Sequence, residues 1–299
     1  MRAERSLAGL LAVVLSLAIG CGQRAGGPTP LRLYCGAGLS DAVAEIAQAF
    51  TEATGVVVEV DYAGSEVLLS RLKLSGRGDV YMPGDEHYVE LARQEGLVAS
   101  SRPACYFVPV ILVRKGNPKG IRTLRDLLRP DVALALGDPQ ACAIGRQTQM
   151  VLSKNGIASD EVDKQVVFRS LTVNELAVHL EVGKADATVV WDAIAAQYAE
   201  GTEAVAIPAE ENVISTVPVA VLSTSTQPEL ARRFADFATG PQGQAIFRKH
   251  HYSTEPPRPS AAGARVPSRE GWAPGAGARE AGGPGARPPG RTGATVEVR

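Results

Sequence analysis

Five short segments of the sequence combine small residues, hydroxyl groups and backbone amides that could hold a small anion. Each lies between a predicted strand and a predicted helix: residues 38–40, 64–65, 143–145, 173–174 and 191–192. Small residues let the backbone approach a ligand, and Ser40, Ser65 and Asn174 are residue types that cap helix N-termini. A single such segment predicts only a cap. Their recurrence favours a binding site, because ligands of open α/β sheets lie beyond the carboxyl ends of the strands.

Positive charge is scarce in these segments, which narrows the chemistry. None of them contains a lysine, and Arg146 is the one cation next to any of them. Helix N-terminal amides and hydroxyls suit a desolvated oxyanion without cations. Hydrogen bonds to a charged group contribute roughly 1.5–3 kcal/mol each, so six or seven of them exceed the ~8 kcal/mol of a micromolar complex.

The composition excludes several other partners. The formal net charge is −1 and aromatic residues make up 5% of the 299 residues. Nucleic-acid binding needs clustered Lys and Arg, and stacking on bases or sugars needs aromatic platforms. The sequence therefore predicts a small-molecule partner and no nucleic acid.

Between Leu31 and Tyr252, short β-branched runs alternate with amphipathic helical stretches, which is typical of an α/β fold. Two apolar runs that contain proline, residues 106–114 and 213–222, are expected to cross between two such units, because proline is disfavoured inside a central strand. The prediction is a two-lobed fold whose hinge consists of two crossing segments, with each lobe a sheet flanked by helices. Lobe 1 comprises residues 31–107 plus 218–253, and lobe 2 comprises residues 108–217.

The two ends of the chain differ from this body. Residues 1–21 carry a positive flank and an 11-residue apolar run from Leu7 to Leu17 that is too short for a membrane span, which needs ~20 residues. The run leads to Cys21 through small residues and resembles a bacterial lipoprotein cleavage site; a plain anchor or an ordinary cleaved signal is the alternative. Residues 22–30 are expected to be a tether. Residues 254–299, rich in Pro, Gly and Arg, are expected to be disordered, with contact to anionic lipid as an alternative.

Other kinds of site find little support. Three cysteines remain after Cys21, and we expect Cys35, Cys105 and Cys142 to be reduced and packed, because a bridge between Cys35 and Cys142 would restrain hinge closure. The histidines lack metal-ligand spacing with any cysteine. Serine-hydrolase, phosphate-loop and zinc-protease motifs are missing, and the dinucleotide fingerprint lacks its third glycine. The prediction is therefore a binding protein without cofactor or resident metal, not an enzyme.

A series of motifs resembles the periplasmic molybdate-binding proteins of ABC importers. Each motif is weak alone, but the series extends over residues 31–252. The matching segments are residues 33–42 (LYCGAGLSDA), 62–65 (YAGS), 78–80 (GDV), 84–86 (GDE), 108–110 (VPV), 137–139 (GDP) and 240–247 (GPQGQAIF). The resemblance implies the two-lobed, type II periplasmic-binding-protein fold.

The resemblance also implies ligand contacts, one position at a time. The first serine of the family falls on Gly38, which keeps only the backbone amide, with Ser40 close by. Its second serine falls on Ser65, beside Gly64. Two contacts that the family makes through backbone amides fall on two second-lobe residues, Ile144 and Val173. Its tyrosine falls on Trp191, whose ring can donate one N–H.

Asp192 follows Trp191 and is harder to interpret. A carboxylate beside a dianion would repel it, so we expect Asp192 to cap the helix that begins at Ala193. The alternatives are an additional oxygen ligand to the metal centre of the anion, or a contact with a cation.

Together these features predict an exported, lipid-anchored protein of the cell envelope, held by Cys21. It is expected to be a monomer that captures molybdate or tungstate and delivers it to the membrane permease of an ABC importer. The alternatives are another small oxyanion such as sulfate or phosphate, or a non-transport sensor or adaptor of the same fold. An enzyme is the least supported class, because Asp192 is its only obvious titratable candidate.

Overall fold

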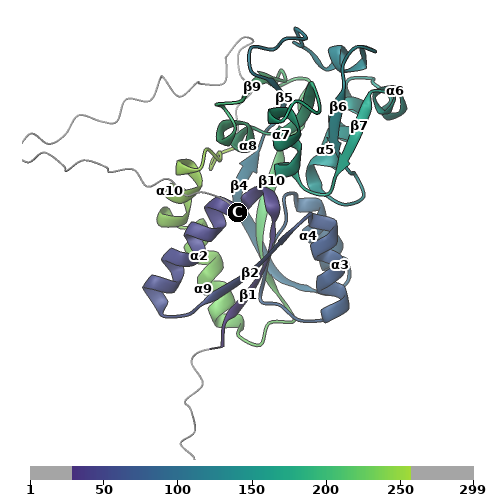
Figure 1. Ribbon diagram of the computed structural model, residues 1–299. Coiled ribbons are helices and arrows are strands. Elements are labelled where there is room, and N and C mark those ends of the chain that lie inside the picture. Colours follow the sequence, from purple (N-terminus) through teal and green to yellow (C-terminus); the bar gives the residue numbers. More distant parts are fainter. Residues whose placement is uncertain (1–28, 257–299) are drawn as a thin grey trace, which may run out of the picture. The chain divides into compact units, whose positions relative to one another are not determined.

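The computed structural model describes residues 29–256, drawn in colour in Figure 1. The predicted leader (1–21), its lipidation site Cys21, most of the predicted tether (22–30) and nearly all of the predicted tail (254–299) lie outside the described residues. Within residues 29–256, no helix has both the length and the apolar character that crossing a bilayer requires. The described residues belong to one compact unit, which contains two separate sheets.

Five strands form the first sheet, in the spatial order β2-β1-β3-β10-β4. Their bounds are β1 (Leu31–Gly36), β2 (Val58–Ala63), β3 (Val80–Met82), β4 (Val98–Phe107) and β10 (Ser215–Leu222). Strand β1 is parallel to β2 and β3, whereas β10 is antiparallel to β3 and β4. Figure 1 shows helices on both sides of this sheet. They are α2 (Ser40–Thr54), α9 (Pro228–Thr239) and α10 (Pro241–Lys249) on one side, and α3 (Ser65–Ser75) and α4 (Glu86–Gln94) on the other.

The second sheet has the order β7-β6-β8-β5-β9. Its strands are β5 (Pro109–Arg114), β6 (Leu134–Gly137), β7 (Val166–Ser170), β8 (Ala187–Trp191) and β9 (Thr202–Ala206). Its helices are α5 (Ala143–Lys154), α6 (Ser159–Asp163), α7 (Val173–Glu181) and α8 (Asp192–Gln197). Two 3₁₀ turns complete the fold, η1 (Ala37–Leu39) before α2 and η2 (Leu124–Leu128) before β6. We call each sheet with its helices a lobe. The prediction of two sheets flanked by helices is confirmed.

Strand β1 and helix α2 show how the local sequence produces these elements. In β1, Leu31, Leu33 and Cys35 are buried and alternate with more exposed residues, as the two faces of a strand require. Helix α2 buries one face that includes Phe50. It ends at Gly55, whose φ of +73° favours glycine and whose amide donates to the Thr51 carbonyl at 2.8 Å. The predicted apolar face and the predicted stop are both confirmed.

The chain passes from the first sheet to the second at Val108, because β4 ends at Phe107 and β5 begins at Pro109. This crossing lies inside the run 106–114 that was expected to contain it. The crossing is short enough that the last residue of one sheet and the first of the other are nearly adjacent. Residues at this point therefore sit next to both lobes.

The prediction for the return crossing is wrong. Most of the run 213–222 is strand β10, which lies between β3 and β4, and the chain crosses back within residues 207–214. Pro218 is tolerated in this strand because the pairing with β4 is irregular between Val217 and Pro218. Strand β10 joins the first sheet at Ser215, whereas the predicted boundary of lobe 1 was residue 218.

Candidate functional site

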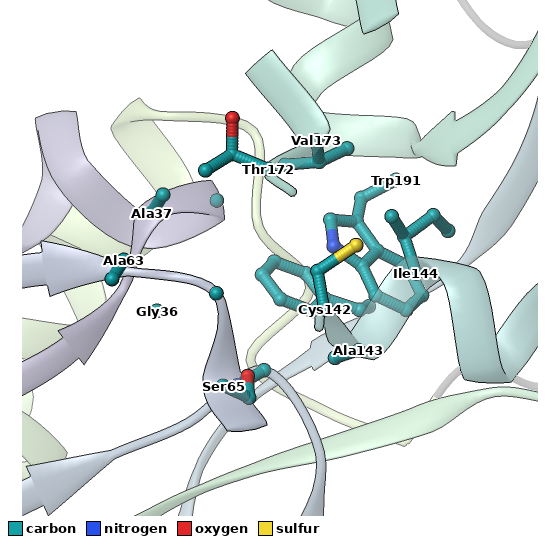
Figure 2. A pocket seen from close by; sticks show the side chains of 14 residues that line it. Gly36, Ala37, Ala63, Ser65, Cys142, Ala143, Ile144, Thr172, Val173 and Trp191 are labelled. Atoms are coloured by element: carbon teal, nitrogen blue, oxygen red, sulfur yellow. Dashed lines mark hydrogen bonds between the residues drawn. The ribbon is translucent and has the colours of Figure 1, made fainter. Parts of the chain in front are cut away.

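A pocket lies between the two lobes at the ends of strands from both sheets, and Figure 2 shows it from close by. Its first-lobe lining consists of Gly36, Ala37, Gly38, Ala63, Gly64, Ser65, Gly84 and Phe107. Its second-lobe lining consists of Cys142, Ala143, Ile144, Thr172, Val173 and Trp191. Six of the predicted contact residues are therefore brought together: Gly38, Gly64, Ser65, Ile144, Val173 and Trp191.

The pocket is small and contains no charged lining residue. The space open to the centre of a water molecule is about 20 Å³, and one water needs about 10–15 Å³ on this measure. In this arrangement the pocket has room for one or two waters, so its guest must be small. None of the lining residues is Asp, Glu, Lys, Arg or His. The nearby cation Arg146 does not line the pocket and forms an ion pair with Asp85.

Three helices begin at the pocket wall. Ser65, Ala143 and Val173 are the first residues of α3, α5 and α7, and all three line the pocket. The amides of a first helical turn have no acceptor within the helix, and they form the positive end of the helix dipole. The turn η1 contributes Ala37 and Gly38 from the first lobe. The wall thus presents neutral hydrogen-bond donors to a negative guest.

Ser65 supplies a side-chain hydroxyl whose orientation is fixed. Its Oγ accepts a hydrogen bond from the Gly84 amide at 3.0 Å, and its carbonyl accepts one from the hydroxyl of Tyr81 at 3.0 Å. Because the Oγ is already an acceptor, its hydrogen remains available to donate. Ser65 is buried, so a guest is the natural acceptor for this hydrogen.

Trp191 closes the pocket from the second lobe. Its ring stacks on Phe107 with the centroids 4.5 Å apart and an angle of 10° between the planes. The residue is only 2% exposed, and no hydrogen bond of its Nε1–H is found within residues 29–256. Figure 2 shows the ring nitrogen facing the space between the two walls. Trp191 therefore offers one N–H donor toward the pocket.

The two lobes touch at two glycines of the pocket wall. A Cβ atom at Gly64 would lie 2.4 Å from the Ala141 carbonyl oxygen and 2.6 Å from that of Leu171, both in the second lobe. Two residues after Gly64, a hydrogen bond joins the lobes directly: the Glu66 amide donates to the Ala141 carbonyl at 3.3 Å. At Gly38, a Cβ would lie 3.0 Å from Val173 Cγ1 and 3.2 Å from Trp191 Cδ1. In this arrangement neither glycine has room for a side chain.

Ser40, predicted as a contact, lies outside the pocket lining. The turn η1 presents Ala37 and Gly38 to the pocket, and α2 then carries Ser40 away. Its Oγ donates to Asp41 Oδ1 at 3.4 Å, and its carbonyl accepts from the hydroxyl of Tyr62. The intervening 3₁₀ turn, which was not predicted from the sequence, separates Ser40 from the pocket lining.

The three predicted N-caps are also wrong by one or two positions. Ser40 and Ser65 are the first helical residues rather than caps, and Asn174 is the second residue of its helix. The residues at the cap positions are Leu39, Gly64 and Thr172, none of which makes a side-chain cap hydrogen bond. First-turn amides of these helices are thus left without side-chain caps at the pocket wall.

Asp192 does not line the pocket but binds the crossing segment. Its Oδ1 accepts from the amides of Ala193 at 2.9 Å and Val108 at 3.3 Å, and its own amide donates to the Val108 carbonyl at 2.8 Å. The prediction that Asp192 caps a helix beginning at Ala193 is wrong, because the helix begins at Asp192 itself and Trp191 occupies the cap position. Burial is the main cause that raises the pKa of Asp192 to about 6.

The three cysteines in the described part of the chain are free and buried, as predicted. Burial raises the pKa of the Cys142 thiol to about 11, so this pocket residue is a neutral thiol at pH 7. Within residues 29–256, no group of three or more His, Cys, Asp or Glu side chains is arranged to hold a metal ion.

Several lining residues were missed from the sequence. Phe107 ends a strand that was not predicted. Cys142 and Thr172, which directly precede observed helices, were not predicted as contacts. Gly84 belonged to a motif that carried the resemblance, so it had a signal that could have placed it in the site. The other two were missed because the observed helices begin at Ala143 and Val173, earlier than the predicted starts at Gly145 and Asn174.

Comparison with known proteins gives the same picture. Residues 31–253 match the model of a family described as bacterial extracellular solute-binding protein. The molybdate-binding protein ModA of Mycobacterium tuberculosis is 28% identical over 248 residues, which cover 79% of this chain and 92% of that protein.

Two solved structures share the fold. The periplasmic molybdate-binding protein of Azotobacter vinelandii superposes with a TM-score of 0.63 at 17% identity, covering 76% of this chain and all of that one. The sulfate-binding protein SubI of M. tuberculosis has a TM-score of 0.66 at 23% identity, covering 75% of this chain and 86% of that one. At such low identity these likenesses show the fold alone, and the two-lobed prediction is confirmed. The chain belongs to the family of bacterial extracellular solute-binding proteins, the non-enzymatic, extracytoplasmic binding components of ABC importers.

Proposed function

We propose that the protein binds molybdate or tungstate in this pocket and delivers the anion to the membrane permease of its importer. The observation that carries the proposal is the meeting of three helix N-termini at a small pocket without charged side chains. The proposed contacts are Gly38, Gly64, Ser65, Ile144, Val173 and Trp191.

Closure of the lobes explains how neutral donors can suffice. When water is excluded, the local dielectric falls and each hydrogen bond to the anion strengthens. Phosphate is disfavoured in such a site, because it keeps a proton near pH 7 and that proton requires an acceptor. No carboxylate lines the pocket, and the Ser65 hydroxyl already accepts from Gly84. A fully ionised oxyanion is thus the better guest.

The argument against phosphate does not separate molybdate from sulfate. Both are tetrahedral dianions, so cavity size must separate them. The identity to a molybdate-binding relative over most of both chains supports molybdate. Sulfate is the second candidate, because it has the same charge and shape and the pocket wall has no charged residue that would distinguish the two anions. Gly38, which lacks a hydroxyl, and Trp191, which carries an indole, are the residues that would change the preference between molybdate and sulfate.

Titration calorimetry with molybdate, tungstate, sulfate and phosphate tests the proposal. We expect molybdate and tungstate to bind at micromolar or lower dissociation constants, which correspond to ~8 kcal/mol or more, and phosphate to give no heat. Tight sulfate binding without a molybdate response would replace the proposed ligand. No binding of any of the four anions would favour the alternative of a sensor or adaptor.

The proposal extends to the N-terminal region by sequence alone. We propose lipid attachment at Cys21, because the apolar run and the small residues before it resemble a lipoprotein cleavage site. A monomer is proposed with one site per chain, because the pocket takes all its lining residues from this chain.

A further inference from the structure

One ion pair joins the two lobes beside the pocket. Arg146 lies in the first turn of α5, two residues after the wall residue Ile144, and Asp85 follows the wall residue Gly84. Arg146 Nη1 is 3.5 Å from Asp85 Oδ1. Asp85 is fixed in place, because it caps α4 by accepting from the His87 amide at 2.8 Å and also accepts from the Ser215 hydroxyl.

No other ion pair within residues 29–256 connects the lobes. The remaining pairs each join elements of a single lobe. The side chains of Arg146 and Asp85 are 29% and 12% exposed, so the pair is partly shielded from water. Partial burial makes an ion pair stronger and less sensitive to salt than a surface pair.

We propose that Arg146 and Asp85 are positioning residues that hold the lobes closed and so set how slowly the bound anion leaves. The part of the inference that concerns release of the anion rests on the proposed function. The part that concerns closure of the lobes does not. Asp85 caps a helix of lobe 1, and Arg146 belongs to a helix of lobe 2. Separation of the lobes therefore breaks the pair, and closure forms it.

The pair also explains how a cation can lie near the site without contacting the guest. In the open arrangement Arg146 is unpaired and attracts anions toward the pocket. On closure Asp85 neutralises Arg146, so the closed pocket gains no net charge from it. Arg146 then acts on the rate of release through Asp85 rather than through direct contact with the anion.

Stopped-flow binding of molybdate to the full chain separates these effects. Arg146→Gln is compared with Arg71→Gln, which removes the same charge and an ion pair to Asp61 at 2.6 Å within lobe 1. We expect Arg146→Gln to raise koff about 5-fold, as for loss of a favourable ion pair, and Arg71→Gln to leave it unchanged. Asp85→Asn should raise koff by a similar factor while also raising kon, because it removes a negative charge beside the pocket. The double variant should dissociate no faster than either single variant.

A second measurement needs no ligand. The Glu66 amide is in the first turn of α3 and donates across the lobes to Ala141, so its hydrogen exchange reports lobe opening. In the free protein, Arg146→Gln should speed this exchange about 5-fold and Arg71→Gln should not. Equal exchange and equal koff in the two variants would overturn the inference. If the wild type binds no oxyanion and Arg146→Gln still speeds exchange, the proposed function fails and the closure role stands.

Discussion

The two walls of the pocket are built on opposite plans. The first-lobe wall consists almost entirely of glycine and alanine, with Ser65 as its one polar side chain and Phe107 at the crossing. The second-lobe wall carries larger side chains, including Ile144, Val173 and Trp191. One lobe presents bare backbone and the other supplies the volume that fills the cleft.

The two lobes therefore contribute to closure in different ways. Where Gly64 faces the second lobe, the opposing atoms are backbone carbonyls that cannot move aside. Where Gly38 faces it, the opposing atoms belong to the side chains of Val173 and Trp191. The second lobe therefore excludes a side chain strictly at Gly64 and less strictly at Gly38. The side chains of the second wall are needed to fill the cleft. Substitutions on the two walls should fail for different reasons.

The largest effect is expected at Gly64. In Gly64→Ala, the new Cβ would be 2.4 Å from a backbone oxygen of the other lobe, so the closed arrangement forms only if the backbone shifts. We expect molybdate affinity to fall about 100-fold, because binding then draws on a closed state that is rarely populated. Calorimetry measures this loss. Gly38→Ala should cost less, about 5-fold, because the side chains it meets can shift by a few tenths of an ångström.

The melting temperature provides the control for both variants. The φ of Gly64 is −64° in an extended conformation that alanine adopts without strain, so lobe 1 should fold normally. An unchanged melting temperature in the absence of ligand, together with lost binding, identifies closure as the step affected. If Gly64→Ala binds as tightly as the wild type, the glycine contact is not part of the bound state.

Trp191→Phe probes the opposite wall and should have the next largest effect. A phenyl ring preserves stacking on Phe107 but removes the Nε1–H, which faces the pocket. A hydrogen bond to a charged group is worth roughly 1.5–3 kcal/mol, so affinity should fall about 10- to 100-fold. Equal affinity of Trp191→Phe and wild type would show that the indole only fills space.

The fold was largely predictable because its strongest signals are local. Helix α2 has an apolar face at regular spacing and a glycine stop, and both depend on few residues. Strand β4 was not predicted, because most of residues 98–103 are exposed and show no apolar alternation. Its partner β10 was misinterpreted as a crossing, because Pro218 is compatible with a strand only where the pairing is irregular, and pairing is not visible in a single sequence.

The site was predictable where backbone position alone matters. The rule that ligands lie beyond strand ends brought Gly64, Ile144 and Val173 to one place without knowledge of their side-chain contacts. Phe107 could not be placed in this way, because its contact with Trp191 depends on how the two sheets meet at Val108. The ion pair between Asp85 and Arg146 was missed for the same reason, since its partners are 61 residues apart and belong to different lobes.

Asp192→Asn should have the smallest effect on binding and a clear effect on stability. Asp192 adjoins Trp191 but lies outside the pocket lining, so molybdate affinity should remain within about 2-fold of wild type or tighten slightly as a nearby negative charge is lost. A loss of 10-fold or more would mean that the carboxyl group reaches the guest. Trp191→Phe is the matched comparison, because it should change affinity at the neighbouring residue without altering any ionisable group.

The stability effect of Asp192→Asn depends on pH in a defined direction. Burial raises the pKa of Asp192 from 3.8 to about 6, so the folded protein retains a proton that the unfolded chain loses. The contribution of Asp192 to the free energy of unfolding is therefore fully present below pH 4 and is lost as the pH rises through 6, a change of about 3 kcal/mol. Asn stays neutral and can still accept from the Ala193 and Val108 amides. Denaturant unfolding should thus find Asp192→Asn similar to wild type at pH 4 and more stable at pH 7; a constant difference at both pH values would exclude titration of this carboxyl as the cause.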